Sequence, residues 1–147
     1  MAYTHSATTV IAGPTIYSVL AQFPVVCFTL TLLTDLAYWY TEYLMWQEFS
    51  SWLLFAGLVF AAFAILAGIV GLLISSAHWP AWPHVIGGLI VVALAFLNSL
   101  VHARDGWTAV VPWGLALSAL TVVVMLATVW LGRRYVIHYS RGAIHHD

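Results

Sequence analysis

Asp35, Asn98, His102 and Arg104 are the residues of this sequence whose types and spacing could do chemistry inside a membrane. Asp35 lies about one helical turn inside the end of a long apolar segment. Asn98 and His102 are four residues apart, which places them on one face of a helix, and Arg104 follows them. A bundle of helices would therefore gather these four side chains into one intramembrane polar cluster.

Two interpretations of this cluster stay open. A carboxyl group and an imidazole that exchange protons would form a proton-linked or quinol-type site, as a proton-coupled carrier centred on Asp35 and His102 would need. Alternatively, Asp35 is neutralised by Arg104 or hydrogen-bonded to Asn98 and simply ties the first helix to the third. Polar groups within a membrane span are costly, so either role would give these residues a reason to be there.

The remaining histidines suggest a cofactor less directly. His84 and His138 lie on the same side of the membrane in neighbouring antiparallel helices, and two facing histidines are what a b-type haem needs. Both lie at the rim of their spans, where an ordinary interfacial histidine is the other interpretation. His78 with His84, and the pair His145 and His146, lack the three or four convergent ligands of a zinc site, so we expect no metal centre.

No sequence motif of an enzyme is present. The chain has no zinc-protease helix motif, no phosphate-binding glycine loop and no nucleophile elbow, so we expect no catalytic residue. Cys27 stands alone in an apolar run, where a small buried side chain is the simplest interpretation and an internal disulfide is excluded.

Four apolar segments must position these residues, over about 16–39, 52–75, 85–101 and 109–131. Each has about the 20 residues that a helix needs to cross a bilayer. Only 6% of the residues are charged and 63% are hydrophobic, whereas soluble domains average about 25% charged residues. We therefore predict an all-α integral membrane protein whose single domain, residues 1–147, is a four-transmembrane-helix bundle. The helices are expected at about 15–40, 51–76, 84–103 and 108–134, and short connections make them run up-down-up-down.

The arginines indicate the orientation. An even number of spans places both termini on one side, which also carries Arg133, Arg134 and Arg141, whereas Arg104 lies on the other. The excess of cations on the cytoplasmic side of membrane proteins predicts cytoplasmic termini in a bacterial inner membrane. With a net charge of −1, the chain has no surface suited to nucleic acid.

Aromatic and small residues indicate contacts. Trp39, Trp46 and Trp52 cluster on the side opposite the termini, as a membrane-interface belt or as a docking surface for other membrane-protein subunits. Small residues at three- and four-residue spacing, including Ala64 with Gly68 and Gly114 with Ser118, predict close helix packing. Pro24 should kink the first helix.

The order and spacing of several short elements resemble the bacterial four-helix membrane family DUF2231 over most of residues 15–143. The elements are Phe23-Pro24, Asp35, Trp52-Leu53-Leu54, Ala56-Gly57, Ala67-Gly68, His84 and Trp130-Leu131-Gly132. The family tends to have histidine where this chain has Gln22, an acidic residue at Gly71 and asparagine at Gly88. The resemblance therefore implies that the chain keeps the family scaffold but has lost most of its polar positions. If family members bind a haem or a metal through those histidines, only His84 of the ligands remains in this chain.

Together these features favour a non-catalytic accessory subunit of a larger membrane complex, with a respiratory or photosynthetic electron-transfer assembly as the expected host. Such a subunit would pack against partner helices in the lipid bilayer and hold lipid or quinone between them. A small b-type cytochrome using His84 and His138 is the alternative, and the Asp35/His102 carrier is a further one.

Overall fold

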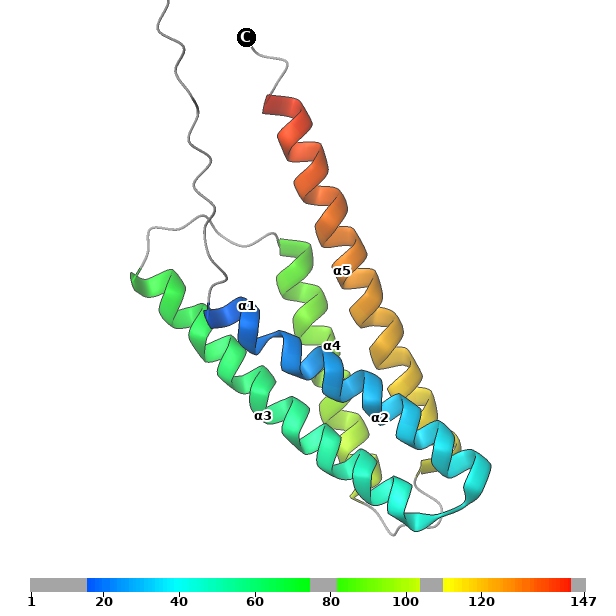
Figure 1. Cartoon of the computed structure of the whole chain (residues 1–147). Coiled ribbons are helices and arrows are strands. Elements are labelled where there is room, and N and C mark those ends of the chain that lie inside the picture. Colours follow the sequence, from blue (N-terminus) through cyan, green and yellow to red (C-terminus); the bar gives the residue numbers. More distant parts are fainter. Residues whose placement is uncertain (1–15, 75–81, 104–109, 144–147) are drawn as a thin grey trace, which may run out of the picture.

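Four long apolar helices pack as an antiparallel bundle in the computed structural model of the chain (Figure 1). The structure describes residues 16–74, 82–103 and 110–143, with the side chains of all of these except 82 and 132–143. The elements in order are α1 (Ile16–Leu20), α2 (Gln22–Thr41), α3 (Leu44–Ile74), α4 (Trp82–His102), the short π-helix η1 (Val110–Gly114) and α5 (Leu115–Ala143). Because the four spans are helical in nearly all of their described residues, the predicted all-α four-helix membrane bundle is confirmed.

The bundle has an apolar outside, whereas its interior holds both apolar side chains and most of the polar ones. On α2 the buried residues recur every three or four positions, and α3 follows the same rule, which places each set on one helix face. Large side chains such as Leu33, Phe63 and Leu126 point outward and are more than half exposed. This arrangement suits lipid as the solvent, because polar side chains in a membrane face the bundle interior.

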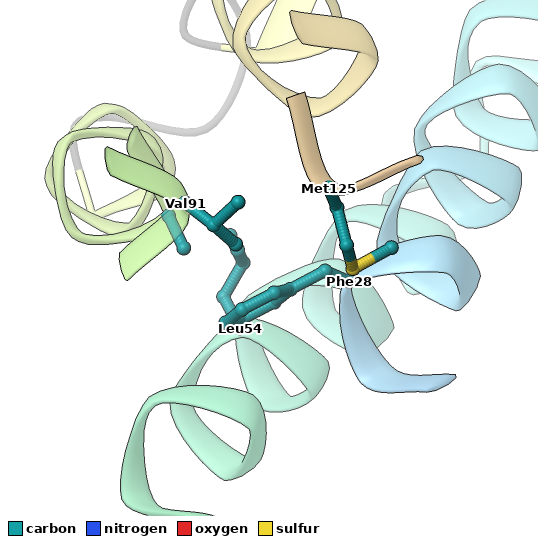
Figure 2. Close-up of a cluster of buried hydrophobic side chains, with 5 residues drawn as sticks. Phe28, Leu54, Val91 and Met125 are labelled. Atoms are coloured by element: carbon teal, nitrogen blue, oxygen red, sulfur yellow. The ribbon is translucent and has the colours of Figure 1, made fainter. Parts of the chain in front are cut away.

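Each spanning helix contacts two neighbours. α2 packs against α3 and α5, and α4 packs against α5 and α3, so the helices form a ring around a shared interior. Phe28 of α2, Leu54 of α3, Val91 and Ala95 of α4 and Met125 of α5 meet in a buried apolar cluster (Figure 2). This cluster separates the two ends of the bundle interior.

The connection predicted over residues 40–51 is wrong. α2 continues to Thr41 and α3 begins at Leu44, so that only Glu42 and Tyr43 join them. Glu42 adopts the left-handed conformation (φ 58°), and its N–H donates to the carbonyl of Tyr38 at 2.7 Å, which ends α2. The polar residues that suggested a loop are helical because Gln47 and Ser50 face the bundle interior. The last helix is also longer than predicted and reaches Ala143 rather than residue 134.

Prolines break two of the spans. α1 ends at Leu20, the residue whose carbonyl would accept from position 24, and Pro24 has no N–H to donate, so the helix is interrupted at the place where Pro24 was expected to kink it. A second break, at the start of the fourth span, was not predicted. Val111 leaves the helical conformation (φ −116°, ψ 125°) because the residue before a proline, here Pro112, disfavours it.

Two glycines allow close helix contacts. A Cβ atom at Gly57 would lie 2.5 Å from Cε1 of Phe28, and one at Gly87 would overlap Thr128. Gly57 therefore sets the approach of α3 to α2, and Gly87 that of α4 to α5. Ala64 is 5% exposed, and a Cβ at Gly68 would lie 3.4 Å from the ring of Tyr17, so these two positions pack within the chain.

Candidate functional site

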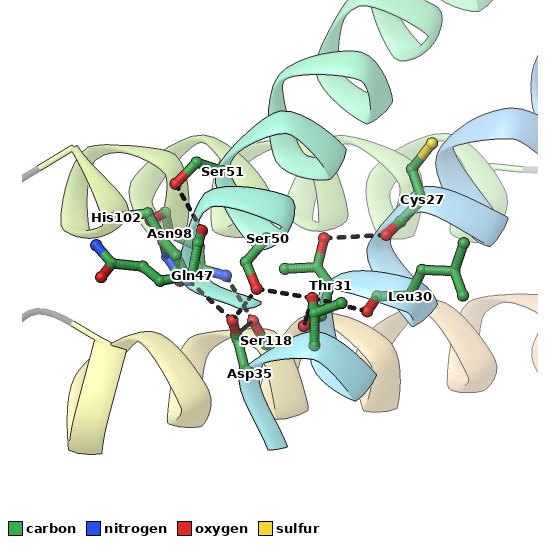
Figure 3. Close-up of polar contacts among 11 residues, drawn as sticks. Cys27, Leu30, Thr31, Asp35, Gln47, Ser50, Ser51, Asn98, His102 and Ser118 are labelled. Atoms are coloured by element: carbon green, nitrogen blue, oxygen red, sulfur yellow. Dashed lines mark hydrogen bonds and ion pairs between the residues drawn. The ribbon is translucent and has the colours of Figure 1, made fainter. Parts of the chain in front are cut away.

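All four spans meet at the carboxyl group of Asp35, which is fully buried (Figure 3). The hydroxyl of Ser50 on α3 donates to Oδ1 at 2.5 Å, and the hydroxyl of Ser118 on α5 donates to Oδ2 at 2.5 Å. Nε2 of His102 on α4 lies 3.0 Å from Oδ1. A single side chain of α2 thus joins the other three helices near the end of the bundle where α2 turns into α3.

The helix periodicity explains why these side chains converge. Asp35 follows the buried residues Phe28 and Thr31 on one face of α2, and Ser50 precedes Leu54 on the inner face of α3. Asp35 and Ser50 therefore lie on the same buried helix faces as the residues of the apolar cluster at mid-bundle. The polar cluster and the apolar cluster are successive layers of one interior.

The hydrogen bonds of His102 fix how many protons the pair holds. Nδ1 lies 3.0 Å from the backbone carbonyl of Asn98, which can only accept, so Nδ1 carries a hydrogen. The bond between Nε2 and Asp35 then contains one proton, which is on the carboxyl when the imidazole is neutral or on Nε2 when the imidazole is cationic. In both forms the Asp35–His102 pair has no net charge, as a buried pair in a membrane requires.

Asn98 extends the network with an incomplete set of partners. Its Nδ2 donates to Oγ of Ser118 at 2.7 Å, whereas its buried Oδ1 has no partner among the described residues. Exchanging the two amide atoms would place Oδ1 against the Ser118 oxygen, whose hydrogen is donated to Asp35, so the orientation with Nδ2 toward Ser118 is the favoured one and leaves only Oδ1 unpaired. Such a buried atom costs about 1–3 kcal/mol.

The hydroxyl group of Thr34 is linked to the Asp35 carboxyl group through Ser50. Thr34 lies with its Oγ1 2.7 Å from Oγ of Ser50. Thr34 has one hydroxyl hydrogen, which it can donate to Ser50 or to the backbone carbonyls of Leu30 and Thr31, at 3.0 and 2.9 Å. The Ser50 hydroxyl thus lies between Thr34 and the carboxyl group of Asp35, to which it donates.

The structure brings together Asp35, Asn98 and His102 from the set that the sequence suggested, whereas Arg104 lies outside the described residues. Sequence reasoning missed Ser50 and Ser118. Ser50 fell in the wrongly predicted loop, and Ser118 was interpreted as a small residue for helix packing. The signal that would have found Ser50 is its spacing from Gln47 and Leu54, both buried on the same face of α3.

The histidine pair proposed for haem is not brought together by the described residues. His84 is exposed near the start of α4, and the side chain of His138 lies outside the described part of α5, as do residues 78, 145 and 146. Among the residues that the structure describes, no group of three or more His, Cys, Asp or Glu side chains could hold a metal ion.

A matched pair of neighbouring serines tests the network. Ser50→Ala should lower the free energy of unfolding by about 0.6–1.7 kcal/mol, the usual range for an interhelical hydrogen bond in a membrane protein. Ser51→Ala removes the same hydroxyl from a residue that bonds within its own helix, to the carbonyl of Gln47, and should cost less than about 0.5 kcal/mol. Reversible unfolding in mixed micelles measures both, and equal losses would contradict the assignment.

The arrangement can hold a proton and connect helices. Asp35, His102 and Asn98 are each at most 4% exposed. The carboxyl oxygens are occupied by two hydroxyls and an imidazole of the same chain, so the cluster as it stands is closed to a substrate.

Comparison with known proteins agrees with this architecture. No curated protein and no solved structure matches the chain significantly. The family profile described as "Predicted membrane protein (DUF2231)" matches residues 13–144, nearly the whole chain and all four spans. The resemblance inferred from the sequence is therefore confirmed, and the chain belongs to the DUF2231 family of membrane proteins.

Proposed function

We propose that this membrane protein is a non-catalytic accessory subunit that packs against partner helices in a larger membrane complex. The observation that carries the proposal is the closed hydrogen bonding of Asp35, whose two oxygens are taken up by Ser50, Ser118 and His102. A buried carboxyl group used in this way stabilises one arrangement of four helices. A bundle held in one arrangement is suited to presenting a fixed surface to a partner.

The surface that supports docking is an aromatic rim at the end of the bundle with the polar cluster. We define the rim by its exposed aromatic residues, which are Trp39, Tyr40, Tyr43, Trp52 and Trp113. Trp39 is 61% exposed and Trp52 is 70% exposed, whereas Ala64 and Gly68 already pack within the chain. Of the packing residues that the sequence suggested, Trp39 and Trp52 therefore remain available to a partner or to the membrane interface.

The host and the location are part of the same proposal. Asp35, His84 and His102 are of the residue types that handle protons or haem in electron-transfer assemblies, which favours a respiratory or photosynthetic host. The three arginines after residue 131 favour cytoplasmic termini in a bacterial inner membrane.

A proton-linked role is the second candidate, because the hydrogen bond between Asp35 and His102 holds one proton that can belong to either group. For this role, water or a substrate must reach a pair that is closed in the present structure. Asp35→Asn would then abolish transport while the protein still folds. The accessory role instead predicts that the folded variant keeps its place in the complex.

Removal of the rim tryptophans tests the accessory role. The double variant Trp39→Ala/Trp52→Ala should lose most of the stoichiometric partners that co-purify with the wild type in mild detergent, because buried tryptophans dominate interface energies. The control is Phe63→Ala, which removes a ring that is 52% exposed on the same helix as Trp52. Quantitative mass spectrometry of the purified material measures the result. Equal recovery of partners in both variants, or a wild type that purifies alone, would refute the proposal.

A further inference from the structure

A cavity of about 290 Å³ lies in the half of the bundle that adjoins the start of α1, the end of α3 and the start of α4. Phe28, Val91 and Met125 of the apolar cluster line its inner part, so this layer separates it from the Asp35 site. Along α4 the cavity extends from His84 to Val92, which is about 12 Å at 1.5 Å per residue. An apolar cavity of about 150 Å³ already holds benzene, so this one has room for a substituted ring and part of a chain.

Small residues create the space. Ala61, Ala64 and Gly68 line it from α3, and Gly88 lines it from α4. A Cβ atom at Gly88 would meet no other atom within 4 Å, which means that a side chain added there would enter open space. The small residues that the sequence suggested for helix contacts thus also leave room between the helices.

The cavity is reached from the bilayer. Ile69, Leu72, Leu89 and Val129 line it and are each at least 38% exposed, so apolar side chains surround the opening. A molecule that enters here must first dissolve in the membrane, and its apolar part will be buried against the inner wall.

The polar side chains that line the cavity determine which polar headgroup such a molecule can have. Tyr17 and His84 lie near the outer end of the cavity, and Thr128 already donates its hydroxyl hydrogen to the carbonyl of Val124. Among the described residues that line the cavity there is no Lys, Arg, Asp or Glu. A phosphate headgroup would lack a cation here, whereas an uncharged carbonyl can accept a hydrogen bond from the imidazole or the phenol.

We propose that the cavity binds a lipid-soluble quinone, with its ring beside His84 and Tyr17 and the first part of its tail against Phe28, Val91 and Met125. One ring carbonyl accepts a hydrogen bond from the imidazole of His84. The inference does not depend on the role in a larger complex, because it concerns the isolated chain and is tested on it.

The test uses the full-length protein in lipid nanodiscs and decylubiquinone as the probe, with binding measured by titration calorimetry. Gly88→Leu fills the cavity and should weaken binding by roughly tenfold or more, as expected when a side chain occupies the ligand space. Gly71→Leu is the control, since a Cβ there also meets nothing within 4 Å but Gly71 does not line the cavity. Its binding should equal that of the wild type.

A second variant keeps the test decisive if Gly88→Leu does not fold. His84→Phe removes a hydrogen-bond donor at the mouth and should weaken binding by about three- to tenfold, the usual worth of one hydrogen bond. Circular dichroism checks that each variant is helical. Unchanged affinity in both variants, no binding by the wild type, or retention of phospholipid with no displacement by the quinone would each overturn the proposal.

Discussion

Asp35→Ala is expected to lower the free energy of unfolding by about 2–5 kcal/mol, since three interhelical hydrogen bonds are lost at about 0.6–1.7 kcal/mol each. The change leaves the hydroxyls of Ser50 and Ser118 without their acceptor and Nε2 of His102 without its hydrogen-bond partner. Buried donors without acceptors cannot turn to water here, because the site is closed on every side by the four helices. The loss should therefore exceed that of any single change among its partners.

Reversible unfolding in mixed detergent micelles measures the effect. Glu48→Ala is the control, because Glu48 is an exposed carboxyl group on α3 and its removal should cost less than about 0.5 kcal/mol. Asp35→Asn should lie between the two, since an amide can accept from one serine but offers its own N–H₂ to the other partners. A loss as small for Asp35→Ala as for Glu48→Ala would show that the cluster does not stabilise the bundle.

Gly57→Ala is expected to cost about 1–3 kcal/mol, the usual penalty for overpacking a core. The added Cβ would lie 2.5 Å from Cε1 and 2.9 Å from Cδ1 of Phe28, and 3.1 Å from Cβ of Cys27. Phe28 is 2% exposed and packed in the apolar cluster, and the space beside it is the cavity that it lines together with Val91 and Met125. The clash is relieved either by turning the ring toward the cavity, which takes it out of its contacts in the apolar cluster, or by moving α3 away from α2.

Gly71→Ala provides the matched control, because the same substitution on the same helix meets no atom within 4 Å. Alanine is the better helix former, so this variant should be as stable as the wild type or slightly more stable. Thermal unfolding followed by circular dichroism distinguishes the two variants. If Gly57→Ala were equally tolerated, the close approach of α2 and α3 at this position would be refuted.

The number and type of the spanning helices were predictable because long apolar segments have few alternatives in a bilayer. The helix ends were less predictable. Gln47, Glu48 and Ser50 look like a polar loop, but two of them are buried, and polarity alone cannot separate a solvated turn from a polar bundle interior. The helix break near Pro24 was predictable from the sequence. The break before Pro112 was not predicted, because this proline lies close to the start of its span.

The candidate site was predictable in part for the same physical reason. Asp35, Asn98 and His102 stand out because an ionisable or amide side chain in a membrane needs a partner. Serine gives no such signal, since it also serves as a small packing residue. The partners of Asp35 on α3 and α5 depend on how the helices are aligned along one another, and this alignment is set by contacts such as that of Gly57 with Phe28 rather than by any local pattern.

The origin of the Asp35 network in four separate spans has a consequence for biogenesis. Asp35 enters the membrane with the first span, but the hydroxyl of Ser118 arrives only with the last. A chain that has inserted three spans, or that has lost its fourth, carries a buried carboxyl group without its full set of donors. The network is therefore complete only when all four spans are in place, so that insertion of the last span is also the step that satisfies the carboxyl group of the first.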